Sequence, residues 1–153
     1  MSWWLVHAEH TLSEDVPAPP AEVRDFYVDL GNIKLVHPLI VSVESLSHSQ
    51  TPDGVVHSYR VRDRIPLGPF TLNNTYRARV RVPVSGDVLT EADQSPGVHL
   101  RGTVSFEPIP AGTRVTERIR IAAPRPLARI TTREAVKAHV AMLAAIRRRF
   151  EDG

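Results

Sequence analysis

The sequence predicts an α+β fold: a curved antiparallel sheet of about seven strands, two short helices after the first strand, and a long C-terminal helix over the concave face. Two observations carry this prediction. Apolar and polar residues alternate through most of residues 39–122, which is the period of a strand. Apolar residues recur at helical spacing within 20–36 and 127–151. Because a lone long helix buries its apolar stripe against such a sheet, we expect a single domain over residues 1–153.

The first strand is expected over residues 3–12, where apolar and polar side chains alternate. Pro20 then suits the first turn of a helix, because a proline there loses no hydrogen bond. We expect Gly31-Asn32 to close this helix and residues 33–36 to form a second helical turn before Pro38. The apolar residues at helical spacing are Val23, Phe26, Tyr27 and Leu30.

Six more strands are expected between residues 39 and 122, each with period-two alternation. They are residues 39–47, 55–65, 70–82, 87–93, 98–108 and 113–121. Glycine- and proline-rich turns separate them, and such short connections make an antiparallel meander. Pro124 and Pro126 end the sheet, and the long helix is expected from about residue 127 to residue 151.

Composition excludes several classes of function. The chain has no cysteine, which excludes disulfides, thiolate nucleophiles and cysteine metal sites. No HExxH, P-loop or GxGxxG motif occurs, so we expect neither a metal nor a cofactor. No apolar run reaches the roughly 18 residues of a membrane span, and the N-terminus lacks a basic signal region, so we expect a cytoplasmic protein. The net charge of +2 and the absence of a basic block disfavour nucleic-acid binding.

Three local stretches and the C-terminal helix resemble the helix-grip superfamily. The stretches are VPAPPAEVRDFYVDL, GNIKLVHPLIVSVESL and GTRVTERIRI. That superfamily includes START lipid-transfer domains, Bet v 1-like proteins and the polyketide cyclase/dehydrase group. The resemblance implies an elongated, mostly apolar cavity between the long helix and the curved sheet. Members bind lipids, polyketides or other apolar molecules there, and some catalyse cyclisation or dehydration.

Strand parity directs a minority of polar side chains to the concave face, and the long helix adds one more. An unpaired buried polar group costs roughly 1–3 kcal/mol, so these side chains either satisfy one another or line a cavity. A mostly apolar pocket with a few converging polar groups is the usual form of a small-molecule site. We therefore favour the cavity. The predicted ligand-binding residues are His37, His57, Tyr59, Asn74, Tyr76, Glu117, His139 and Leu143.

Two functions use these residues, and the sequence leaves both open. The first is binding of a polyketide- or lipid-like molecule. In the second, a cyclase/dehydrase, Tyr76 and Asn74 would hydrogen-bond a ketone oxygen. Either Glu117 or His139 would then move the proton, which makes Tyr76, Glu117 and His139 the catalytic candidates.

Two carboxylates also have simpler structural interpretations. Glu117 is expected to pair with His57 or His139, whatever its catalytic role. Asp63 lies near the end of its expected strand, so a solvated or turn-bonding carboxylate is favoured over a functional one.

A third function would act through the outer face of the sheet. Arginines alternate in two neighbouring strands, at positions 60, 62 and 64 and at positions 77, 79 and 81. They share a face if the strands pair through the intervening Pro-Leu-Gly-Pro turn. Acidic residues on adjacent strands could balance them, or the surface around Arg62 and Arg79 could bind an acidic carrier protein or another anionic partner.

Overall fold

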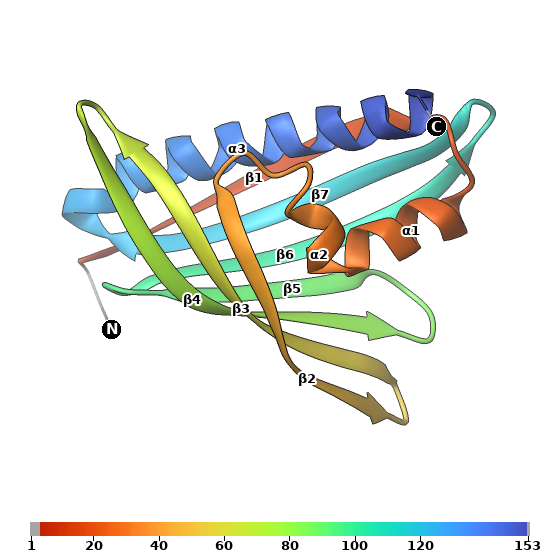
Figure 1. Cartoon of the computed structure of the whole chain (residues 1–153), viewed down its shortest axis with the longest axis horizontal. Helices are drawn as coiled ribbons and strands as arrows, with labels where there is room; N and C mark the ends of the chain where they lie inside the picture. Colours follow the sequence, from red (N-terminus) through yellow and green to blue (C-terminus); the bar gives the residue numbers. More distant parts are fainter. Residues whose placement is uncertain (1–3, 153) are drawn as a thin grey trace.

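A seven-stranded antiparallel sheet curves around one long helix in the computed structural model, which describes residues 4–152 (Figure 1). The strands are β1 (Leu5–Val16), β2 (Ile40–Thr51), β3 (Gly54–Leu67), β4 (Phe70–Pro83), β5 (Val88–Gln94), β6 (Val98–Ile109) and β7 (Gly112–Pro124). The helices are α1 (Pro20–Val28), α2 (Leu30–Ile33) and α3 (Arg125–Asp152). This arrangement confirms the predicted α+β fold.

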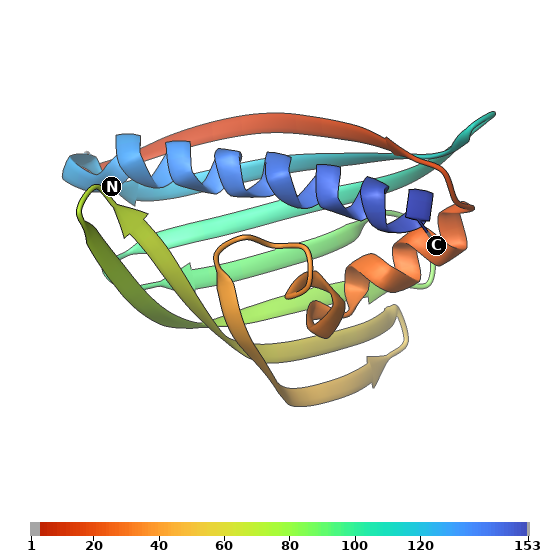
Figure 2. The ribbon, with the colours of Figure 1, turned by 45° about the horizontal axis from the view of Figure 1, so that its top comes forward.

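The strand order is β1-β7-β6-β5-β4-β3-β2, so hairpins connect β2 through β7 in sequence. The chain starts at one edge of the sheet, because β1 pairs antiparallel with β7, and re-enters at the opposite edge as β2. Helix α3 lies along β1 and β7, and α1 and α2 lie near its C-terminal end (Figure 2). Three helices therefore cover the concave face near the C-terminal end of α3, and α3 alone covers it near its N-terminal end.

The boundary between α1 and α2 differs from the prediction. Helix α1 ends at Val28 rather than at Gly31-Asn32. Helix α2 covers Leu30–Ile33 rather than the predicted residues 33–36, and residues 34–36 form a turn. Asp29 has an extended backbone, and its Oδ1 accepts a hydrogen bond from the Gly31 N–H at 2.8 Å. An aspartate at this position satisfies an amide that the helix start leaves free. Residues 31–32 therefore lie inside the second helix instead of closing the first.

Helix α3 has two halves with different surroundings. In the C-terminal half, Leu143 and Ile146 are buried in the main apolar core, and the Phe150 ring packs edge-on against Phe26 with centroids 5.7 Å apart. The N-terminal half faces a cavity instead, and His139 lies where the two halves meet. In the described part of the chain, no helix is long and apolar enough to cross a membrane.

Candidate ligand cavity

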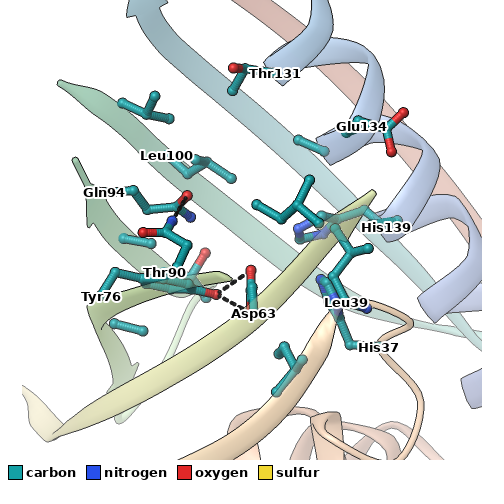
Figure 3. A pocket seen from close by; sticks show the side chains of 18 of the residues that line it. His37, Leu39, Asp63, Tyr76, Thr90, Gln94, Leu100, Thr131, Glu134 and His139 are labelled. Carbon is teal, nitrogen blue, oxygen red and sulfur yellow. Dashed lines mark hydrogen bonds between the residues drawn. The ribbon is translucent and has the colours of Figure 1, made fainter. Parts of the chain in front are cut away.

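A cavity of about 230 Å³ lies between the first half of α3, the connection from α2 to β2, and the concave faces of β3 to β6 (Figure 3). Most of its lining is apolar and includes Ile65, Leu72, Leu100, Leu127, Ile130 and Met142. Its polar lining includes His37, Asp63, Asn74, Tyr76, Gln94 and His139. This is the composition expected of a site that buries an apolar molecule and orients it by a few hydrogen bonds.

Asp63 is a buried carboxylate on β3, with only 5% of its surface exposed. The Tyr76 hydroxyl on β4 lies 3.2 Å from both of its oxygens and donates to them. Burial raises the pKa of Asp63 to about 6, although the Tyr76 hydrogen bond and the nearby His139 act in the opposite direction. Asp63 can therefore gain or lose a proton near neutral pH, which suits a general acid or base.

Our expectation of a solvated Asp63 is wrong. Strand β3 continues to Leu67, two residues beyond the predicted end, so Asp63 has paired strand on both sides. Its register partner is Asn74, which also faces the concave side. Asp63 follows the buried Tyr59 and Val61 at every second position along β3, which places it on the concave face.

Glu117 and His139 form the ion pair that we expected as one of two alternatives. The His139 Nδ1 donates to the Glu117 Oε1 at 3.0 Å, and the Tyr27 hydroxyl of α1 donates to the other carboxylate oxygen. Burial alone would lower the pKa of His139, but Glu117 and then Asp63 outweigh it and raise that pKa, which favours the imidazolium. With Nδ1 engaged, Nε2 is the nitrogen of His139 left for a ligand.

His37 lies against His139, with the two rings perpendicular and their centroids 5.6 Å apart. The Leu39 backbone N–H donates to the His37 Nδ1 at 3.2 Å. Burial, followed by the proximity of His139, lowers the pKa of His37 to about 3. The ring is therefore neutral, with its proton on Nε2, and it brings a hydrogen-bond donor to the cavity without a charge.

We expect the His37 ring to show no titration between pH 5 and 8, because its pKa of about 3 lies below this range. Two-dimensional ¹H–¹⁵N spectra that detect the imidazole nitrogens would show a constant neutral tautomer with the proton on Nε2. A His37 transition near pH 6.5 would contradict the neutral ring.

Asn74 and Gln94 form a hydrogen-bonded pair of amide side chains in the cavity lining. The Asn74 Nδ2 donates to the Gln94 Oε1 at 2.9 Å, which joins β4 to the end of β5. The pair keeps further donor and acceptor capacity for a ligand. Gln94 was missed because the predicted strand ended at Asp93, one residue earlier.

Four of the predicted residues do not line the cavity. His57 stacks on His48 with ring centroids 4.7 Å apart, and Tyr59 and Leu143 are buried in the apolar core. Glu117, which is 2% exposed, lies behind His139. Parity correctly assigned the strand residues to the concave face, but only part of that face borders the cavity and the rest borders core. Direct ligand contact by these four side chains stays a prediction without geometric support, whereas His37, Asn74, Tyr76 and His139 lie in the lining.

The outer arginine face is largely interleaved with acids. Arg60 pairs with Glu44 at 3.0 Å, and Arg81 pairs with Glu91 at 3.5 Å. Directly opposed arginines occur once between β3 and β4, at Arg60 and Arg77. Arg62 and Arg79 are exposed and make no ion pair within residues 4–152. Acidic residues on adjacent strands thus balance part of the arginine charge, as in the first of the two alternatives. Binding of an acidic carrier protein at Arg62 and Arg79 stays a prediction.

Comparisons with known proteins agree with this architecture. Residues 7–151 match the family described as "Polyketide cyclase / dehydrase and lipid transport". TTHA0849 from Thermus thermophilus has 18% sequence identity and a TM-score of 0.71, over 97% of each chain. Zhui aromatase/cyclase from Streptomyces sp. R1128 has 18% identity and a TM-score of 0.70, over 96% of this chain and 94% of that one.

A third solved structure, the di-domain ARO/CYC BexL from the BE-7585A biosynthetic pathway, has 16% identity and a TM-score of 0.68. The match covers 92% of this chain and 49% of BexL. At these identities the structural likeness concerns the fold alone. No curated protein matches the chain. Since the family match spans nearly the whole sequence, the chain belongs to the polyketide cyclase/dehydrase and lipid transport family and has its helix-grip fold.

Proposed function

We propose that this protein binds an apolar small molecule, of polyketide or lipid type, in the cavity beneath the first half of α3. The observation that carries the proposal is a mostly apolar cavity of about 230 Å³ on which polar side chains converge, among them His37, Asp63, Asn74, Tyr76, Gln94 and His139. These side chains come from β3, β4, β5, α3 and the connection from α2 to β2. A filled core would place such groups in contact with one another only, whereas here they border open volume.

Native mass spectrometry of protein purified from its own host, followed by extraction of any bound molecule, tests this proposal directly. A stoichiometric apolar ligand would support it and would supply the compound for turnover assays. An empty protein that also failed to bind neutral aromatic probes would contradict it.

Filling the cavity is expected to block binding. Ala135 lines the cavity from α3, whereas Ala141 is exposed on the same helix. We expect Ala135→Phe to weaken binding of 2-naphthol at least about tenfold, because the added ring occupies the volume that the ligand needs. Ala141→Phe, the matched control, should leave the affinity unchanged. Isothermal titration calorimetry measures both, and equal affinities for the two variants would place the ligand elsewhere.

A second candidate function, cyclase or dehydrase activity, is favoured by one further observation: a carboxyl group with a pKa of about 6 borders the cavity. The Asp63 carboxylate would take a proton from the carbon next to a ketone, and the His139 imidazolium would donate to the ketone oxygen. Asp63 thereby replaces Glu117, which does not reach the cavity, as the proton acceptor. Turnover of the extracted ligand would distinguish a catalyst from a carrier.

A further inference from the structure

We propose that the cavity selects ligands whose polar end is a hydrogen-bond donor, a phenol, an alcohol or an amine, which binds the Asp63 carboxylate, and that it rejects carboxylates. This inference rests on the proposed function and names the chemical class that the same cavity accepts. It follows from the charges that border the cavity and from the hydrogen-bonding capacity that Asp63 keeps.

Among the described side chains that border the cavity, carboxylates outnumber positively charged groups. Of the two histidines that line the cavity among the described residues, His37 is neutral, and His139, whose pKa is raised, has its Nδ1 3.0 Å from Glu117. The side chain of Glu134, on α3, adds a carboxylate near the cavity and lies 3.8 Å from Arg133. Arg79 and Glu91 contribute to the wall but belong to the outer face, where they occupy opposed positions in the β4–β5 ladder.

Asp63 keeps unused hydrogen-bonding capacity, although His139 lies near enough to lower its pKa. Within the described residues, its side-chain hydrogen bonds are those to the Tyr76 hydroxyl, and it makes no salt bridge. The ionised carboxylate offers about four acceptor positions, so a single hydroxyl donor leaves room for a second donor from a ligand. The Tyr76 hydroxyl is already directed at Asp63, so it is less available to donate to an anionic ligand.

A carboxylate ligand would meet this arrangement unfavourably. Its charge would lie near Asp63 in a largely apolar, poorly solvated space, where like charges repel far more strongly than in water. The neutral His37 offers a single N–H rather than a positive charge, and the charge of the other donor, His139, already faces Glu117 through Nδ1. A donor group, by contrast, would complete the hydrogen bonding of Asp63, and an amine would also balance its charge.

Naphthalene derivatives that differ only at position 2 test the inference. At pH 8 we expect 2-naphthol, a neutral donor, to bind more tightly than 2-methoxynaphthalene, which lacks the donor. We expect 2-naphthoate to bind at least about tenfold more weakly than 2-naphthol. Isothermal titration calorimetry gives all three affinities. Equal or tighter binding of 2-naphthoate would overturn the inference while leaving the proposed function intact, whereas no binding of any probe would count against the proposed function itself.

Two variants distinguish the effect of the Asp63 carboxylate from the effect of a change in net charge. Asp63→Asn removes the charge but keeps an oxygen that can accept from Tyr76, and we expect it to reduce the preference for 2-naphthol over 2-naphthoate to within about threefold. Asp87→Asn makes the same change in net charge at an exposed position between β4 and β5, and we expect it to retain the full preference. If the Asp87 variant lost the preference, or the Asp63 variant kept it, the selectivity would not come from Asp63.

The pH dependence provides an independent measurement on the unaltered protein. The titratable groups that face Asp63 are Tyr76 on β4, His139 on α3 and His37 before β2. Lowering the pH from 8 to 5 protonates Asp63, while His37 stays neutral. We expect the preference against 2-naphthoate to diminish accordingly. A preference that was unchanged or larger at pH 5 would contradict the role of Asp63.

Discussion

Asp63→Asn is expected to stabilise the protein by up to about 3 kcal/mol at pH 8. Burial raises the pKa of Asp63 from 3.8 to about 6, a difference of roughly two units at about 1.4 kcal/mol each. That free energy is the penalty of keeping this carboxylate ionised inside the fold. Asparagine has nearly the same shape and can accept the Tyr76 hydroxyl hydrogen bond, so it removes the penalty and preserves the contact.

The sign of the effect with pH follows from the same shift. Between pH 3.8 and about 6 the folded protein holds the Asp63 proton that the unfolded chain has lost. Stability contributed by this group is therefore complete below pH 3.8 and disappears as the pH rises through about 6. The advantage of Asp63→Asn should consequently be absent at pH 4 and fully developed at pH 8.

Urea denaturation of both proteins at pH 4, 6 and 8 measures this difference. Asp87→Asn, an exposed change of the same kind, should alter the free energy of unfolding by less than about 0.5 kcal/mol at each pH. If Asp63→Asn destabilised the protein at pH 8, the carboxylate would be well solvated or paired, and its proposed place in the ligand site would lose its electrostatic basis.

Most of the fold was predictable because each strand carries its own evidence. The alternation in residues 70–82 and 113–121, bounded by proline and glycine turns, left one way to pair neighbouring strands. The boundary of the short helices was less predictable. A glycine such as Gly31 often ends a helix, but here the Asp29 side chain accepts a hydrogen bond from the Gly31 amide and a new helix starts. Local propensity does not distinguish these two outcomes.

The sequence predicted which side chains lie on the concave face of the sheet, but not which of them border the cavity and which lie in the core. Parity directs Tyr59, Asp63 and Tyr76 inward, yet Tyr59 lies in the core while the other two border the cavity. Tyr59 lies beside Asp29 and Leu30 at the start of α2, so its environment depends on a contact between elements distant in sequence. The partner of Glu117 shows the same limit, because the Tyr27 hydroxyl arrives from α1, 90 residues earlier in the chain.

The second large effect is expected at Glu117. Glu117→Ala should destabilise the protein by about 3–5 kcal/mol, because it leaves the partly buried His139 and the buried Tyr27 hydroxyl without their acceptor. Glu44→Ala, which breaks an exposed pair with Arg60, should cost less than about 1 kcal/mol. Equilibrium urea unfolding at pH 6 compares them, and similar losses for the two variants would contradict the buried ion pair.

Glu117→Gln distinguishes the charge of this pair from its shape. Glutamine can still accept one hydrogen bond, but the charge that raises the pKa of His139 is gone, and burial then lowers that pKa below its value in the parent protein. Because a raised histidine pKa stabilises the fold only below that pKa, the deficit of Glu117→Gln should be largest in mild acid and shrink as the pH rises. An NMR titration of His139 in both proteins measures the shift. If the His139 pKa were the same in both proteins, Asp63 rather than Glu117 would be the carboxylate that raises it.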